Sequence, residues 1–475
     1  MNINDLALAV EGELTGNNDF FTKEGFTGRF TFLNEAKEGD IVIRHWINGK
    51  GIGIAASKKV ACLITQNPKD DAVEFAKKLN FPLIVTDKIE LANAYALSWT
   101  VDTYSPNSKN IVITGTNGKS TTSHLIYHIL KNAGFHVLTN TDSESEFNTL
   151  IDPMISKLIA DEVINNGNLD YLVIEVSEVQ GWLGKLMQHH AFLMANALKA
   201  DVGVITNIAM DHIGLVNSID EVFDEIKTVP EAIRDACVLN YDDELVRKLK
   251  HKNVFYSSMN KLNMNNAVYF NDGIYYKDEL IVKKEDLPFI SNHFIQNILS
   301  AVGACISLDL SIDKIASGVK SYKALNRRFT KLNDKPLVYD DFAHNPDGIK
   351  ATIAETLKLL KENQKLFVVC SIRGSRGVEI NKLNVRALVS SFNPNIELIL
   401  SSSNDVVDNL NHVNQDERNI FFEVLDKNNI HYTHFYNLED SLRYTLNKAD
   451  NKDIILLIGA QGMDPANGLL ENIVG

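Results

Sequence analysis

The sequence lacks the features of several specialised protein classes. Its 475 residues include only four cysteines and ten prolines, and no apolar run reaches the roughly 18 residues that a membrane span needs. Positive charge is also in deficit, because 47 Lys and Arg against 61 Asp and Glu give a net charge of −14. These absences argue against a membrane span, a disulfide scaffold and a protein that neutralises nucleic-acid phosphates over a broad surface.

The cysteines are far apart and lie in mostly apolar surroundings, at positions 62, 237, 305 and 370. We interpret them as reduced thiols packed in the core, in preference to metal ligands or redox groups. The first residues show no basic start followed by an apolar stretch, as a secretion signal would. We therefore expect a cytoplasmic protein.

What is present is the composition of a globular protein, with 45% hydrophobic and 23% charged residues. The length suggests about three domains. Over residues 1–105, short apolar runs at 40–43, 61–65 and 82–86 alternate with helix-like stretches such as 71–79, which indicates a small α/β domain. A polar segment with one proline, at 102–110, is a candidate linker.

Two further cycles of strands and helices follow, so the sequence predicts an α/β fold with domains at 1–105, 106–325 and 326–475. Apolar strands are expected at 111–114, 171–176 and 202–206, and their continuous hydrophobicity favours parallel strands buried on both faces. The last domain begins near the pair Arg327 and Arg328, with expected strands at 337–340, 366–370, 397–400 and 454–458.

The strongest local motif is TGTNGKSTT at 114–122, between an expected strand and an amphipathic helix. Gly115 and Gly118 would let the backbone N–H groups of the loop, including those of Thr116, Asn117 and Thr121, point at a phosphate. Lys119 would reach the terminal phosphates of a nucleotide, and the Ser120 hydroxyl would bind Mg²⁺. The alternative is an ordinary strand-to-helix turn.

Polar residues also follow the next two expected strands. Glu175 ends one of them, and Asn207, Asp211 and His212 follow the other. Because parallel strands present their carboxyl ends at one edge of a sheet, Glu175 and His212 could hold a second metal ion beside the one on Ser120. Alternatively, Glu175 caps a helix and His212 is a turn residue.

These motifs, followed by NHFIQN at 292–297, RRF at 327–329 and DDFAHNPDG at 340–348, resemble the Mur ligase family in order and spacing. The resemblance covers nearly the whole chain and is greatest to the archaeal pseudomurein peptide ligases. It implies a first domain that binds a nucleotide-linked precursor, a central phosphate-loop domain with a parallel sheet that binds ATP, and a C-terminal Rossmann-like domain that binds the amino acid.

The resemblance also implies roles for individual residues. Lys119 would bind the terminal phosphates of ATP, while Ser120, Glu175 and His212 would hold two Mg²⁺ ions. Lys227 best matches a lysine that is carbamylated in many members and helps to hold the second ion; the alternative is an exposed helix lysine. Asn297 would contact adenine, Arg328 the phosphates or ribose, and Asp341 the ribose. Ser177, His344 and Asn345 would contact the other substrates.

The sequence departs from the family pattern in several places. Glu178 replaces a usual serine, Phe294 an asparagine and Phe342 a tyrosine, and the turns RGSRG at 373–377 and GAQG at 459–462 differ from their family forms. We therefore expect an ATP-dependent, ADP-forming amide ligase that adds a free amino acid to a nucleotide-linked cell-wall peptide. The alternatives are a folylpolyglutamate-like or cyanophycin-like ligase with another carboxylate acceptor, and an ATP-binding module without activity.

Overall fold

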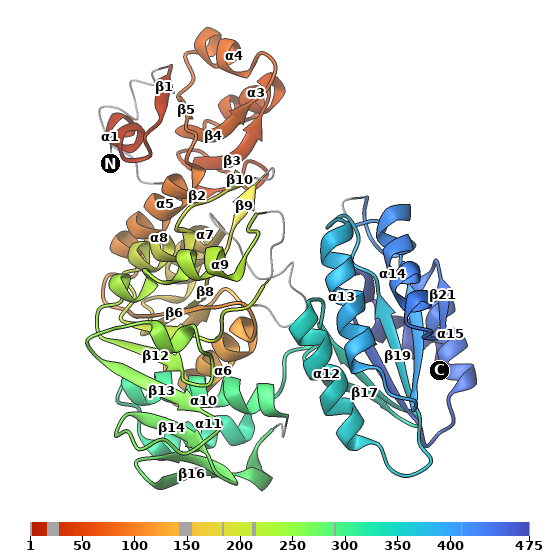
Figure 1. Ribbon diagram of the computed structural model, residues 1–475. Helices are drawn as coiled ribbons and strands as arrows, with labels where there is room; N and C mark the ends of the chain where they lie inside the picture. Colours follow the sequence, from red (N-terminus) through yellow and green to blue (C-terminus); the bar gives the residue numbers. More distant parts are fainter. Residues whose placement is uncertain are drawn as a thin grey trace. The chain divides into compact units, whose positions relative to one another are not determined.

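The computed structural model describes residues 2–16, 28–141, 154–182, 185–210, 215–288, 291–409 and 411–474. The chain divides into two compact units, one ending at Tyr322 and one beginning at Lys323 (Figure 1). Over these described ranges, the first unit contains two large sheets and a small two-stranded one, and the second unit contains one sheet. Among the described residues, no helix is both long and apolar enough to cross a membrane.

The first sheet has the strand order β1-β5-β4-β3-β2, and all its neighbouring pairs except β1–β5 are parallel. Its strands are β1 (Glu13–Thr15), β2 (Phe30–Thr31), β3 (Ile41–Ile47), β4 (Cys62–Pro68) and β5 (Leu83–Val85). They alternate with α1 (Ile3–Ala9), α3 (Gly49–Ser57), α4 (Ala72–Leu79) and α5 (Ile89–Tyr104). The three predicted strands and the predicted helix of this region are confirmed. The predicted linker is shorter than expected, because α5 extends to Tyr104 and the next strand starts at Lys109.

The second sheet has nine strands in the order β16-β15-β14-β13-β12-β11-β6-β8-β7. Its parallel part contains β6 (Lys109–Thr114), β7 (Val137–Thr139), β8 (Tyr171–Glu175), β11 (Val202–Ile205), β12 (Ala236–Asn240), β13 (Val254–Ser258) and β14 (Ala267–Phe270). Two antiparallel strands, β15 (Gly273–Tyr276) and β16 (Glu279–Lys283), extend one edge. The predicted strands β6, β8 and β11 are confirmed as adjacent parallel strands, whereas β7 and β12 to β16 were not predicted.

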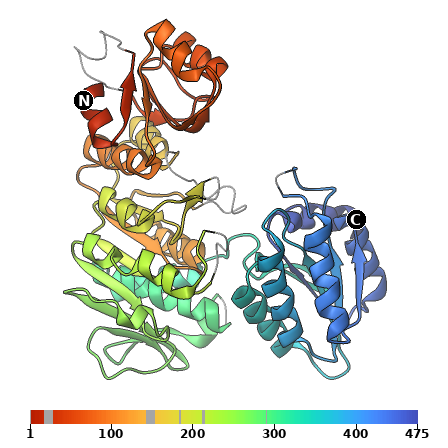
Figure 2. The ribbon, with the colours of Figure 1, turned by 45° about the horizontal axis from the view of Figure 1, so that its top comes forward.

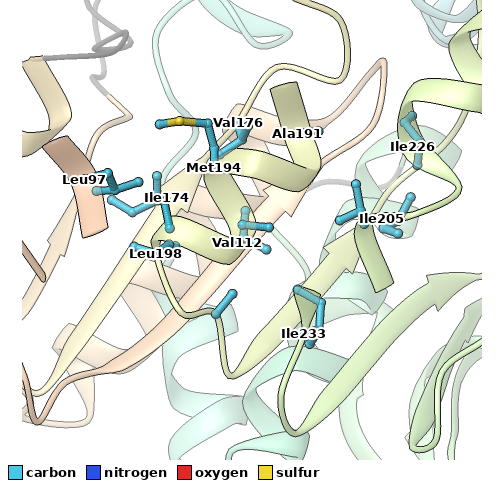
Figure 3. Close-up of a cluster of buried hydrophobic side chains, with 14 of the residues drawn as sticks. Leu97, Val112, Ile174, Val176, Ala191, Met194, Leu198, Ile205, Ile226 and Ile233 are labelled. Carbon is cyan, nitrogen blue, oxygen red and sulfur yellow. The ribbon is translucent and has the colours of Figure 1, made fainter. Parts of the chain in front are cut away.

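Helices cover both faces of this sheet (Figures 1 and 2). Side chains of α6 (Lys119–Asn132), α10 (Asn292–Ser307) and α11 (Ile312–Ser321) share one core cluster with the sheet. The opposite cluster combines strand residues with α5, α7 (Met154–Asn166), α8 (His190–Ala197) and α9 (Ile219–Ile226). Figure 3 shows Ile174 of this second cluster near Met194 and Leu198, and Ile205 near Ile226. Burial on both faces explains why the strands are continuously apolar. A short ribbon, β9 (Gly181–Trp182) with β10 (Lys185–Leu186), follows β8.

The second unit has one six-stranded sheet in the order β17-β18-β22-β19-β20-β21, parallel except for β17. Its strands are β17 (Thr330–Asp334), β18 (Leu337–Asp341), β19 (Leu366–Ser371), β20 (Ile396–Ser401), β21 (Tyr432–Phe435) and β22 (Ile454–Ile458). One core cluster includes α12 (Pro346–Leu359), α13 (Val378–Ser391) and α14 (Gln415–Lys427), and another includes α15 (Leu438–Lys448) and α16 (Ala466–Val474). The four strands predicted here, and the α/β fold as a whole, are confirmed.

Candidate active site

The predicted phosphate loop joins the end of β6 to the start of α6, as the motif requires. Gly115 and Gly118 have backbone φ angles of +116° and +84°, in the region that favours glycine. A Cβ atom on Gly118 would lie 2.2 Å from Oδ1 of Asn297, so this glycine also allows α10 to approach the loop closely. The first turn of α6, which includes Ser120 and Thr121, directs its backbone N–H groups toward this loop.

Asn207, which follows β11, fixes the shape of the loop. Its Oδ1 accepts a hydrogen bond from the N–H of Asn117 at 2.9 Å, and its Nδ2 donates one to the Asn117 carbonyl at 2.8 Å. The N–H of Thr116 donates to the Asn207 carbonyl at 2.9 Å. Sequence analysis placed Asn207 at this edge of the sheet, but gave it no role.

Lys119 points back toward its own loop. Its Nζ donates hydrogen bonds to the carbonyls of Gly115 at 2.7 Å and Thr116 at 2.9 Å. It also forms an ion pair with Oε2 of Glu178 at 2.9 Å, and only 1% of the Glu178 side chain is exposed. The ion pair links the phosphate loop to the segment that follows β8, and no sequence motif predicted it.

Glu175 is the last residue of β8 and is nearly buried, as predicted for the carboxyl edge of the sheet. Asn140, which follows β7, holds its backbone: Oδ1 accepts from the Glu175 N–H at 2.8 Å and Nδ2 donates to the Glu175 carbonyl at 2.9 Å. The Thr141 hydroxyl donates to Oε2 of Glu175 at 3.3 Å. Polar residues directly after a buried strand were the signal that could have identified Asn140 and Thr141.

The donor set of this edge suits a metal-bound nucleotide. Glycine-loop N–H groups and the Lys119 ammonium fit phosphate oxygens, while the Ser120 hydroxyl and the Glu175 carboxylate are the hard oxygen ligands that Mg²⁺ prefers. His212, the other predicted metal ligand, lies outside the described residues. Within the described ranges there is no cluster of three or more His, Cys, Asp or Glu side chains arranged to hold a metal.

Two other predicted residues of the first unit bond through their side chains to near neighbours in the sequence. Lys227 lies at the C-terminal end of α9 with about half of its side chain exposed, and its Nζ lies 2.6 Å from Oδ1 of Asp224. This is the arrangement of an exposed helix lysine. The Ser177 hydroxyl donates to the carbonyl of Val179 at 2.6 Å.

The remaining predicted residues belong to the second unit, at the carboxyl end of β18. The Asp341 carboxylate accepts hydrogen bonds from the N–H groups of Phe329 and Ala343 and from the Thr352 hydroxyl, at 2.8 to 3.1 Å. The Arg328 guanidinium lies over the Phe342 ring, 5.0 Å from its centre. Asn345 caps α12 by accepting from the N–H of Gly348, and Nδ1 of His344 lies 2.9 Å from the Phe342 carbonyl. These bonds fix the four residues within their own unit.

Arg327 anchors the same strand end. Its buried guanidinium bonds to the Asp340 carboxylate, to Asp464 and to the carbonyls of Gly459 and Ala460. Burial raises the pKa of Asp340 to about 6, although Arg327 acts in the opposite direction. The GAQG turn is therefore held by an arginine from a distant segment.

The RGSRG turn is held by a buried carboxylate. Glu417 of α14 accepts hydrogen bonds from the N–H groups of Ser375, Arg376 and Gly377, at 2.7 to 3.0 Å. The four cysteines are buried and unpaired, as predicted, and burial raises the pKa of each thiol.

Comparison with known proteins identifies both units. Residues 113–305 match the Mur ligase middle domain, and residues 327–461 match the Mur ligase glutamate ligase domain. The UDP-N-acetylmuramate–L-alanine ligase of Caldicellulosiruptor bescii is 27% identical over 376 residues, which cover 74% of this chain and 74% of that protein. These matches confirm the resemblance inferred from the motifs.

Solved structures show the same fold at lower identity. A pseudomurein peptide ligase type C from Methanothermus fervidus superposes with a TM-score of 0.62 at 21% identity, over 92% of this chain and 95% of that chain. A bifunctional folylpolyglutamate synthase/dihydrofolate synthase from Yersinia pestis, solved with AMPPNP and a Mn ion, gives a TM-score of 0.59 at 17% identity, over 80% and 93%.

Proposed function

We propose, because this chain belongs to the Mur ligase family, that it is an ATP-dependent amide ligase. It joins an amino acid to a nucleotide-linked peptide precursor of murein or pseudomurein, in the cytoplasm where ATP is available. The observation that carries the proposal is the glycine loop with Lys119 at the start of α6, beside Glu175 at the carboxyl end of β8. Two of the relatives named above carry such substrates in their names, the UDP-N-acetylmuramate–L-alanine ligase and the pseudomurein peptide ligase.

The proposed reaction has two steps. An acceptor carboxylate oxygen attacks the γ-phosphorus of ATP, so that an acyl phosphate forms and ADP leaves. The amine of the amino acid then attacks the acyl carbon, loses a proton and expels inorganic phosphate, which leaves an amide. Both reactants of the first step are anionic, so positive charge at the loop is needed to bring them together.

Lys119 would supply part of this charge, and its position beside the carbonyls of the phosphate loop supports a contact with the terminal phosphates. Ser120, Glu175, His212 and a carbamylated Lys227 would hold the two proposed Mg²⁺ ions, which neutralise phosphate charge when bound. Asn207 and Asn140 keep the loop and the end of β8 in shape while the charged groups bind.

Substrate contacts outside the loop complete the proposal. Asn297, which lies against Gly118, contacts the adenine. Arg328 and Asp341 are further proposed contacts of the nucleotide, while Ser177, His344 and Asn345 are proposed contacts of the acceptor or the amino acid. The existing bonds of Asp341 and Asn345 hold these side chains in fixed orientations, which favours recognition over proton transfer.

The test is ADP release in a matrix of nucleotide-linked acceptors and free amino acids, with the product identified by mass spectrometry. We expect ADP only when both an acceptor and an amino acid are present. Lys119→Ala abolishes turnover, whereas Lys131→Ala, which removes an exposed lysine from the last turn of the same helix, leaves it unchanged. ADP release without an amine would contradict ligation, and activity on folate-type acceptors alone would favour the folylpolyglutamate-like alternative. Absence of turnover with every acceptor, despite ATP binding, would favour a non-catalytic module.

A further inference from the structure

The ion pair between Lys119 and Glu178 places a negative charge beside the lysine of the phosphate loop. Both side chains are largely removed from water, with 15% of Lys119 and 1% of Glu178 exposed. They come from segments 59 residues apart that meet at the carboxyl edge of the central sheet. The main cation of the loop is therefore already neutralised by a carboxylate of the same chain.

The other hydrogen bonds of Lys119 strengthen this arrangement. An ammonium group has three donors, and here it faces the carbonyls of Gly115 and Thr116 as well as Glu178. To bind a phosphate oxygen, Nζ must give up at least one of these acceptors. Separating Lys119 from Glu178 is costly because a buried carboxylate has little solvation by water.

The consequence concerns how a nucleotide enters the loop. A metal-free triphosphate brings only negative charge to a lysine whose charge is offset by Glu178. A magnesium-bound triphosphate brings a cation with it, so that neither the phosphates nor Glu178 are left without a counter-charge. Glu178 thus disfavours the metal-free form more strongly than the metal-bound form.

We propose that Glu178 is a positioning residue that makes nucleotide binding depend on Mg²⁺ by holding Lys119 in a neutralised pair. This inference rests on the proposed ATP-binding function and adds to it a selection between two forms of the nucleotide. Glu178 acts through Lys119 and takes no part in bond formation.

The experiment measures equilibrium binding of a non-hydrolysable ATP analogue by calorimetry, once with excess EDTA and once with excess Mg²⁺. Glu178→Gln keeps the shape and one acceptor oxygen but removes the charge. We expect about tenfold tighter metal-free binding in this variant and a change below about threefold in the presence of Mg²⁺. The metal-free affinity of the variant should also fall more steeply with added salt.

Two variants separate this effect from a general one. Glu178→Asp retains the charge, so it should retain the metal dependence of the wild-type protein. Glu162 forms another pair in the same unit, with its Oε1 2.9 Å from Nε2 of His136, which directly precedes β7. Glu162→Gln removes that carboxylate and should change neither the metal-free nor the magnesium-bound affinity.

The possible outcomes distinguish the two proposals. If the wild-type protein does not bind the magnesium-bound analogue, the proposed function fails and the inference fails with it. If the wild-type protein binds it but Glu178→Gln loses affinity equally with and without Mg²⁺, Glu178 only holds the loop in place and this inference alone is overturned. The inference is also overturned if the ratio of metal-free to magnesium-bound affinity is the same in Glu178→Gln as in the wild type.

Discussion

The side chain of Asn207 hydrogen-bonds both backbone polar groups of Asn117, accepting from its N–H at 2.9 Å and donating to its carbonyl at 2.8 Å. The two residues are 90 positions apart, and their pairing connects the end of β11 to the middle of the phosphate loop. An amide side chain can make both bonds at once because it has a donor and an acceptor side by side. The loop is therefore shaped before a nucleotide arrives.

Replacing Asn207 should weaken nucleotide binding more than it weakens the fold. Asn207→Ala removes both bonds, and Asn207→Asp keeps the acceptor but places a carboxylate oxygen beside the Asn117 carbonyl. We expect a loss of ATP affinity of about 10- to 100-fold in each, with a fall of about 1–2 kcal/mol in the free energy of unfolding. Calorimetric titration and urea unfolding measure the two effects.

Asn132→Ala is the control for Asn207, because Asn132 lies at the other end of α6 and its exposed side chain bonds to Ser317, away from the loop. It should leave ATP affinity unchanged. An Asn207→Ala protein that binds ATP as tightly as the wild type would show that the loop keeps its shape without this bond.

The close approach of Asn297 to Gly118 can be tested by comparing Gly118 with Gly134, because both glycines have a positive φ. Gly118→Ala places a Cβ 2.2 Å from Oδ1 of Asn297, whereas Gly134→Ala meets nothing within 4 Å. The cost of a left-handed alanine, about 1 kcal/mol, is common to both. We expect Gly118→Ala to lose at least about 100-fold in ATP affinity and Gly134→Ala to lose only stability. Equal losses in both would show that backbone strain alone matters.

Lys227 tests the second metal site. Its exposed ammonium pairs with Asp224 here, and carbamylation would replace that ammonium with a carboxylate that can bind Mg²⁺. We expect Lys227→Ala to lose most of its ligase activity and to recover part of it with small carboxylic acids such as acetate. Folding is checked by circular dichroism. A folded variant with full activity, or one that acetate does not restore, would count against carbamylation.

His434 of β21 should make the stability of the protein depend on pH. Burial, and then the nearby Arg418, lower its pKa to about 4 from an ordinary value of 6.5. The unfolded chain therefore binds a proton between these values while the folded chain does not, so stability is highest above about pH 6.5 and falls as the pH drops toward 4. Because the side chain is only half-buried, we expect a contribution of about 1–2 kcal/mol.

The measurement is the urea midpoint at about pH 7 and about pH 5. In His434→Gln, which keeps a polar partner for the Ser402 hydroxyl, the difference between the two midpoints should be smaller than in the wild type. The same difference in both proteins would show that other groups account for the acid sensitivity.

The sequence by itself determined the α/β fold, the phosphate loop and the place of Glu175. These follow from local signals: continuous apolar runs, glycines at fixed spacing before a helix, and a carboxylate at the end of a strand. Strand β16 was among those not predicted, because at the edge of the sheet it buries only two of its five residues and gives a weaker apolar pattern.

Only the tertiary structure decided which polar groups meet. Asn207 with Asn117, Asn140 with Glu175, and Glu178 with Lys119 are pairs separated by 35 to 90 residues, and no spacing rule connects them. The order of the strands in the central sheet brings their carboxyl ends to one edge, and burial there requires each polar group to find a partner. A local motif can therefore identify a phosphate loop. It cannot show that a carboxylate offsets the charge of the loop lysine, because only the fold brings Glu178 beside Lys119.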